Sequence, residues 1–149
     1  MSAATREGES LGKPGVDSRM GGWTGNTFAD VEVGKVFPVH RLKRSFEEIQ
    51  RFASVAGWPD MPRVLPAFLL NQLRSLKHHV RLPPGVLHAR EELELHSAAF
   101  PNEELEVEVR FSDKFIKNDK RFVVVDQHVY SAVDGRDVLN IKRTFYWPC

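Results

Sequence analysis

From residue 86 to the C-terminus, the sequence follows the pattern of β-strands. Leucines alternate with glutamates in residues 92–95, which is typical of a strand with one solvent-exposed face. Asn118-Asp119 and Asp134-Gly135 have the residue types of hairpin turns. The segment between these two turns is apolar on both faces and is therefore predicted to be a central strand. Four strands are predicted, over residues 86–97, 104–116, 120–133 and 137–147.

Before these strands, apolar residues recur at helical spacing in two segments. Ser45 and Glu48 have the spacing of a capping box, which predicts a short helix that begins after Ser45 and ends at Gly57. A longer helix is predicted over about Pro66–His79, because proline suits its first turn and leucines form an apolar stripe along it. Residues 28–39 predict a first strand or hairpin.

Composition and charge narrow the class of protein. A chain of 149 residues suits one domain with a substantial core. The formal net charge of +1 gives no basic field for nucleic acid. No apolar run approaches the roughly 18 residues that span a membrane, and the N-terminus lacks the apolar core of a signal peptide. We therefore expect a soluble cytoplasmic protein with no nucleic-acid or membrane partner.

The N-terminal residues differ from the rest of the chain. Residues 1–26 hold six of the ten glycines and almost no large apolar residues, so they are predicted to be a flexible extension. Residues 27–149 form the predicted domain. The single cysteine, Cys149, excludes a disulfide framework and a cysteine metal site. We expect neither a metal nor a cofactor.

Two helices followed by an antiparallel meander predict an α+β fold, in which the helix over Pro66–His79 buries its stripe against the sheet. In this context the chain resembles the hotdog fold and, more narrowly, the MaoC-like enoyl-CoA hydratase and dehydratase family, over residues 28–147. The most specific segment, GVLHAREELELH at 85–96, is similar to the Leu-His-Ala-x-x-Glu-x-x-x-His strand of dehydratase-like N-terminal hotdog halves. Other segments resemble the family in the same order: FADVEVGKVF, SFEEIQRFASVAG, LPAFLLNQL and DGRDVLNIKRTFYW.

The resemblance implies a single hotdog domain, in which an antiparallel sheet wraps around the central helix. It also implies a homodimer, or a heterodimer with a catalytic hotdog subunit, with an acyl-CoA or acyl-carrier thioester bound between the protomers. In active members, the loop before the central helix reads roughly Gly-Asp-x-Asn-Pro-x-His. Its Asp and His handle the water and the proton, and N–H groups at the helix start polarise the thioester carbonyl.

Compared with this motif, the loop has lost its acid–base pair. Gly57 matches the glycine, but Trp58 stands at the acid and Arg63 at the histidine. An indole cannot take a proton from water, and an arginine stays protonated. A shift of one or two residues makes Asp60 the acid, yet no histidine follows it before Leu76. Asp60 is thus the catalytic candidate, and the candidates for substrate binding are Gly57, Trp58, Arg63, Ala67 and Phe68.

Two further groups of side chains are candidates for chemistry. Alternation places His88 and His96 on the polar face of their strand, which favours a solvated or subunit-facing surface. Asp126 and His128 share one face of theirs and are a candidate acid–base pair. Two-residue turns place Asp126 opposite Arg143 as a cross-strand ion pair, whereas three-residue loops turn the neighbouring valines inward instead.

The predicted function is that of an acyl-thioester-binding hotdog protein, a degenerate or non-catalytic hydratase or dehydratase subunit without the Asp/His pair. One alternative is an active but divergent enoyl-CoA hydratase, 3-hydroxyacyl dehydratase or thioesterase. It requires Asp60, His88, or Asp126 with His128, to face the acyl tunnel. The amides of Asn71-Gln72, where thioesterases often carry a carboxylate, weigh against a thioesterase. The other alternative is a non-enzymatic module for assembly or ligand sensing.

Overall fold

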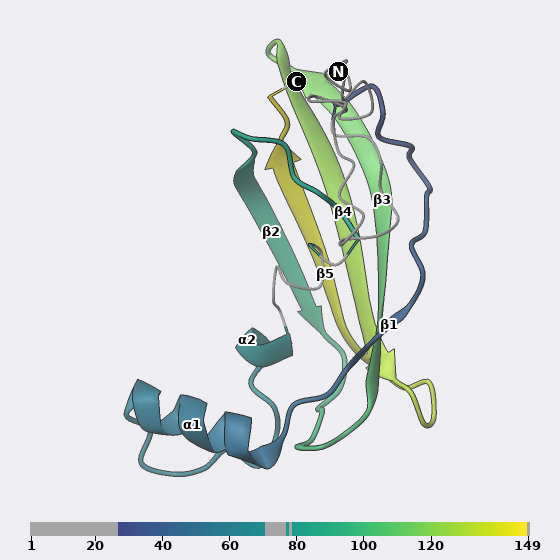
Figure 1. Ribbon diagram of the computed structural model, residues 1–149. Coiled ribbons are helices and arrows are strands. Elements are labelled where there is room, and N and C mark those ends of the chain that lie inside the picture. Colours follow the sequence, from purple (N-terminus) through teal and green to yellow (C-terminus); the bar gives the residue numbers. More distant parts are fainter. Residues whose placement is uncertain (1–26, 71–76, 78, 149) are drawn as a thin grey trace, which may run out of the picture.

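The computed structural model describes residues 27–70, 77 and 79–148, and these residues form a five-stranded antiparallel sheet with helices at one end (Figure 1). The strands are β1 His40–Leu42, β2 Leu87–Leu95, β3 Leu105–Lys117, β4 Lys120–Ser131 and β5 Asp137–Tyr146. Their order across the sheet is β1-β3-β4-β5-β2. The long β2 therefore lies at one edge and the short β1 at the other. The four strands predicted after residue 86 and the α+β class are confirmed.

Two helices precede β2 in the chain. α1 covers Phe46–Ala56 and begins at the predicted capping box. The Ser45 hydroxyl accepts the N–H of Glu48 at 3.1 Å, and the Glu48 carboxylate accepts the N–H of Ser45 at 3.0 Å. α2 covers Ala67–Leu70. No helix within the described ranges is long and apolar enough to cross a membrane.

Two predicted segments fall on residues that the structure does not describe. Of the helix predicted over Pro66–His79, residues 71–76 and 78 lie outside the described residues, and so does the predicted extension at 1–26.

α2 packs against one face of the sheet, which we call the helix-side face; the opposite face is the outer face. Leu69 and Leu70 of α2 are buried in the same core cluster as alternate residues of the central strands. This packing is the one that an apolar helix beside a sheet requires. The sheet residues of the cluster are Leu105, Val107, Val109, Phe111, Val123, Val125, Val129, Val138, Leu139, Ile141 and Phe145.

Three register shifts decide which side chains face the helix, and one of them, at Val138, lies between β4 and β5. The turn at Asn118-Asp119 has two residues, as predicted, with φ values of 51° and 60°. Ser112 is then an extra residue of β3, and the register shifts so that Phe111 stands opposite Val125. A second bulge at Ala89 shifts the register of β2 against β5. A bulge of one residue exchanges the faces of everything beyond it.

The segment before β1 does not form the predicted first strand or hairpin. It runs along β3 and makes a few backbone contacts: the N–H of Gly34 donates to the carbonyl of Phe111 at 2.8 Å, and the N–H of Phe37 donates to that of Val109 at 2.9 Å. Val36 forms one isolated bridge with β3.

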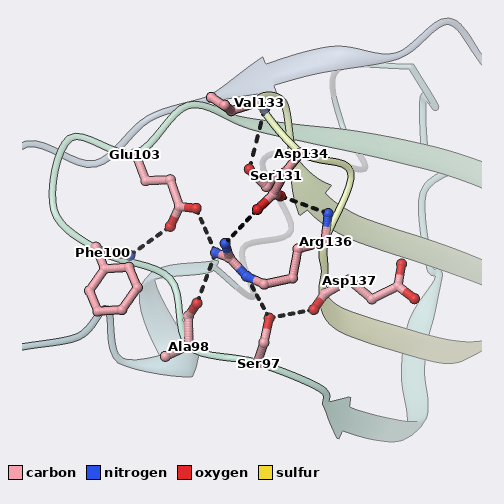
Figure 2. Close-up of polar contacts among 9 residues, drawn as sticks. All are labelled: Ser97, Ala98, Phe100, Glu103, Ser131, Val133, Asp134, Arg136 and Asp137. Carbon is pink, nitrogen blue, oxygen red and sulfur yellow. Dashed lines mark hydrogen bonds and ion pairs between the residues drawn. The ribbon is translucent and has the colours of Figure 1, made fainter.

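Arg136 joins the loop between β4 and β5 to the connection between β2 and β3 (Figure 2). Its guanidinium donates to the Ser97 hydroxyl and the Ala98 carbonyl, both at 3.1 Å, and to the Glu103 carboxylate at 2.5 Å. The same side chain contacts the Asp134 carboxylate at 3.4 Å. The Glu103 carboxylate raises the pKa of Arg136. These contacts fix the end of the sheet at which β5 begins.

Candidate functional site

The loop between α1 and α2 contains most of the predicted site residues. Gly57 ends α1 in a left-handed conformation, with φ of 71°. The next N–H, that of Trp58, donates to the carbonyl of Ala53 at 2.9 Å. At the other end of the loop, the N–H of Leu65 donates to the carbonyl of Ala99 at 2.7 Å. The loop is therefore held both by α1 and by the segment after β2.

The side chains of Trp58, Asp60 and Arg63 lie at the surface of this loop. The Trp58 indole is 42% exposed and meets the Phe52 ring edge-on, with 5.2 Å between ring centroids. Asp60 and Arg63 are both exposed. The loop thus presents an aromatic surface, one cation and one carboxylate, and its sequence contains no imidazole. These residue types suit binding better than proton transfer.

The predicted donors at the start of the second helix are only partly described. Ala67 begins α2, and the N–H of Leu69 donates to the carbonyl of Pro66 at 2.9 Å. The side chain of Phe68 lies outside the described residues. The roles of Ala67 and Phe68 in substrate binding therefore stay predictions.

A charged cluster lies on the helix-side face, where β2 meets β5. The guanidinium of Arg143 is 1% exposed, and its Nε donates to the Glu91 carboxylate at 3.1 Å. His88 Nε2 lies 3.5 Å from the same carboxylate oxygen, and its ring lies 5.4 Å from that of Phe145. Burial lowers the pKa of Arg143, and the Glu91 carboxylate opposes that shift. The cluster places an imidazole and a carboxylate beside each other on the face that α2 covers.

The position of His88 corrects the prediction that it shares the polar face with His96. Because Ala89 is the extra residue of a bulge, His88 stands opposite Phe145 and Glu91 stands opposite Arg143. His96 does lie on the outer face, where its Nε2 is 3.2 Å from the amide nitrogen of Asn140.

A second pair of imidazoles lies close to β1. His79 is buried, and its Nε2 lies 3.1 Å from Nδ1 of His40. The His79 ring also stacks on Phe37, with 5.4 Å between centroids and 16° between planes. His79 therefore belongs to the core rather than to an exposed helix end.

The outer face has a cavity of about 600 Å³, on the opposite side of the sheet from α2. The residues that line it come from β2, β3, β4 and β5. It is therefore separate from the loop that contains Trp58 and Asp60. Five carboxylates and two cations line it: Glu92, Glu94, Glu108, Asp126, Asp137, Arg110 and Lys142.

Asp126 and His128 share one strand face, as predicted, and that face is the outer one. The Asp126 carboxylate lies 3.4 Å from the guanidinium of Arg110, and His128 Nε2 lies 2.7 Å from the Asp137 carboxylate. The predicted ion pair between Asp126 and Arg143 is wrong. The slipped register places the two side chains on opposite faces of the sheet, with Lys142 directly across from Asp126.

Sequence reasoning missed Glu91 and Arg143 as partners. In the sequence, Glu91 is one of several acidic residues of a strand predicted to be exposed, and the predicted register pairs Arg143 with Asp126. The sequence does contain a signal for this pair. Arg143 lies two residues from Ile141 and two from Phe145, so on a strand it shares a face with these apolar residues. An arginine at a core position needs a carboxylate on the adjacent strand.

Comparisons with known proteins define the class of fold. No protein-family model matches the sequence, and none of the curated proteins matches it. Solved structures match most of the chain. The unliganded (R)-hydratase PhaJ1 from Pseudomonas aeruginosa is 20% identical with a TM-score of 0.64, over 82% of this chain and 85% of that one. A MaoC-like dehydratase from Rhodospirillum rubrum is 18% identical with a TM-score of 0.66, over 83% and 97%.

A heteromeric assembly is among the similar structures. The HadBC complex from Mycobacterium tuberculosis, a 3R-hydroxyacyl-ACP dehydratase, matches at 14% identity with a TM-score of 0.55, over 76% of this chain and 96% of that chain. The chain has the hotdog fold of MaoC-like dehydratases and (R)-hydratases, as its sequence predicts.

Proposed function

We propose that the protein binds acyl thioesters as a hotdog subunit without the Asp/His pair and does not itself catalyse hydration. The observation that carries this proposal is the surface of the loop before α2. Trp58 and Arg63 are exposed where the acid and the histidine of the resembling family stand, and Asp60 has no imidazole beside it in that loop. Syn hydration needs both an acid and a base within hydrogen-bond reach of the substrate.

The fold supports the ligand class and the presence of a partner. The similar structures include an (R)-hydratase and a 3R-hydroxyacyl-ACP dehydratase. The latter is a heteromeric complex of hotdog chains, which supports the pairing of this chain with a different one. We infer that this chain pairs with a catalytic hotdog subunit, in the cytoplasm, and contributes the binding surface of its loop. Acyl-CoA and acyl-carrier thioesters both fit this role.

Binding and turnover of acyl-CoA by the purified protein test the proposal. We expect saturable binding of a medium-chain enoyl-CoA, detected by calorimetry, without hydration. Arg63→Ala should weaken binding about fivefold, because an exposed cation beside a phosphate or carbonyl contributes on the order of 1 kcal/mol. Arg51→Ala, which removes an exposed arginine of α1, is the matched control and should leave binding unchanged. Robust hydration by the protein alone would refute the non-catalytic role.

The charged cluster on β2 favours one second candidate, an active but divergent hydratase. His88 lies 3.5 Å from the Glu91 carboxylate on the helix-side face, so an imidazole oriented by a carboxylate exists outside the loop. If the protein hydrates enoyl-CoA, this candidate predicts that His88→Gln lowers kcat at least 100-fold. Asp60→Asn should then have little effect. Absence of both binding and turnover would instead favour a module for assembly alone.

A further inference from the structure

A row of apolar side chains crosses four strands on the outer face, at the end where β3 turns into β4, which lies away from α1 (Figure 1). Phe115 of β3 stands opposite Phe122 of β4, and Tyr146 of β5 stands between Phe122 and Leu87 of β2. Alternation along β4 places Phe122 on the same face as Asp126, which is the outer one. We call Leu87, Tyr146, Phe122 and Phe115 the apolar row.

The apolar row is exposed in spite of its size. Leu87 is 63% exposed and Phe115 is 37% exposed, and Phe122 and Tyr146 are half-buried. The rings of Phe115 and Phe122 stack on each other, with 5.2 Å between centroids and 20° between planes, and Tyr146 meets Phe122 edge-on. The facing sides of these rings are therefore occupied. Such a surface suits acyl chains better than it suits the flat face of a nucleic-acid base, which needs an open ring to stack on.

Cations lie directly beside the apolar row. Lys117 and Lys120 stand opposite each other, one alternate position beyond Phe115 and Phe122, and both are exposed. Like charges directly opposite each other destabilise a strand pair, and neither lysine belongs to an ion pair in the described part of the chain. An anionic surface against this face would relieve the repulsion. Residues 113–122 hold four cations and two carboxylates: Lys114, Lys117, Lys120, Arg121, Asp113 and Asp119.

The charges of the outer face are separated along the sheet. The cavity carboxylates lie away from the apolar row, and Asp126 stands four residues from Phe122 along β4. Four residues of a strand extend about 13 Å, which exceeds the Debye length of about 8 Å at physiological salt. The cavity carboxylates therefore leave the attraction at the two lysines largely intact, and they disfavour an orientation with the cavity against an anionic surface. The net charge of +1 conceals this separation.

We propose that the apolar row and the pair of Lys117 and Lys120 form a docking surface for an anionic lipid bilayer. The row enters the region between head groups and acyl chains, where apolar side chains and the amphipathic ring of Tyr146 are stable. The lysines then contact lipid phosphates, as clusters of cations do at anionic membranes. The expectation of no membrane partner rests on the lack of an apolar run that spans a membrane, and a surface contact needs no such run. This inference goes beyond the proposed function and does not depend on it.

Binding of the full chain to vesicles of defined composition tests the docking surface. In a flotation assay, we expect vesicles of phosphatidylcholine with about one-third phosphatidylglycerol to bind it at least tenfold more tightly than pure phosphatidylcholine. Each cation near an anionic surface contributes about fivefold to the affinity, so Lys117→Gln/Lys120→Gln should weaken binding about 25-fold. Raising the salt concentration should weaken binding of the wild type. Lys43→Gln/Arg51→Gln removes two exposed cations at the α1 end and, as the matched control, should leave binding unchanged.

Two further sets of variants test insertion of the apolar row. Leu87→Ser/Phe115→Ser removes its two most exposed members and should weaken vesicle binding at least tenfold. Val133→Ser, at an 84% exposed position in the loop between β4 and β5, should have no effect. In Phe115→Trp, vesicles with brominated acyl chains should quench the added indole, and in Val133→Trp they should not. Urea unfolding of Lys117→Gln/Lys120→Gln should show at least the stability of the wild type, so that weak binding by this variant does not reflect misfolding.

Four results would overturn the proposal. Equal binding to both kinds of vesicle, or none to either, would show that the lysines make no contact with anionic lipid. Unchanged binding by the lysine and the serine double variants would place the contact elsewhere on the chain. Displacement from vesicles by millimolar glycerol phosphate would show that the lysines bind a free phosphate. Displacement by a single-stranded oligonucleotide, lost in Lys117→Gln/Lys120→Gln, would assign the surface to nucleic acid instead.

Discussion

Replacing Glu91 with glutamine removes the negative charge beside the buried Arg143 and keeps a side-chain oxygen that accepts its hydrogen bond. Breaking one partner of a fully buried ion pair costs about 3–5 kcal/mol, because an uncompensated charge is left in the interior. Arg143 is 1% exposed but Glu91 is 29% exposed, so water replaces part of the lost interaction. We expect Glu91→Gln to lower the free energy of unfolding by about 2 kcal/mol.

A double-mutant cycle isolates the pair from the packing of its side chains. Arg143→Met removes the buried cation and leaves a carboxylate that water can reach, so it should cost less than Glu91→Gln. The double variant Glu91→Gln/Arg143→Met should cost less than the sum of the single changes, by about 1–2 kcal/mol, because both charges leave together. Urea unfolding gives all these free energies on one scale.

Additive effects would contradict this reasoning. They would mean that the 3.1 Å contact between Arg143 and Glu91 adds nothing to the free energy of unfolding beyond what the two side chains contribute separately. His88→Gln should be close to neutral in the same assay, since His88 is half-exposed and stands at the rim of the cluster.

Three further predictions concern stability. Ser45→Ala should cost about 1 kcal/mol in urea unfolding by removing the cap of α1, and Ser45→Thr should retain most of it; equal losses would exclude the capping role. Phe111→Ala should lower the free energy of unfolding by about 3–5 kcal/mol, because it removes a buried ring from the core. Ile116→Ala, at an exposed position, should change it little. The backbone N–H of Arg136 lowers the pKa of Asp134 in the folded protein. The ionised carboxylate therefore stabilises the fold at pH values above its unfolded-state pKa. This stabilisation is lost as the pH falls through its folded-state pKa. The difference in Tm between the wild type and Asp134→Asn should therefore be constant above about pH 5 and shrink below about pH 4; a difference unchanged at pH 2 would contradict it.

Local signals in the sequence predicted the elements well. The spacing of Ser45 and Glu48 located the start of α1, and Gly57 located its end. The residues at Asn118-Asp119 predicted a turn that the structure has, with both residues in the left-handed region. These features depend on a few adjacent residues, so a single sequence contains the information for them.

The faces of the strands were harder to predict, because they depend on bulges that leave little trace in the sequence. Ser112 and Ala89 are ordinary residues for a strand, yet each adds one position to its own strand only. The extra Ala89 moved His88 to the helix-side face, and a further shift between β4 and β5, at Val138, set Lys142 rather than Arg143 opposite Asp126. The predicted location of a candidate acid–base group therefore depends strongly on the register. A shift of one position decides whether its side chain faces the core or the solvent.

β2 lies at one edge of the sheet, and this position affects the tendency of the chain to aggregate in the cell. A free, nine-residue strand edge with exposed leucines is a site of aggregation, and the glutamates between those leucines act as gatekeepers against it. In the pairing proposed above with a catalytic subunit, an excess of this chain would raise the concentration of chains that carry this edge without a partner. Balanced synthesis of the two chains, and removal of the surplus by proteases, would then matter as much for the abundance of this protein as its own folding free energy.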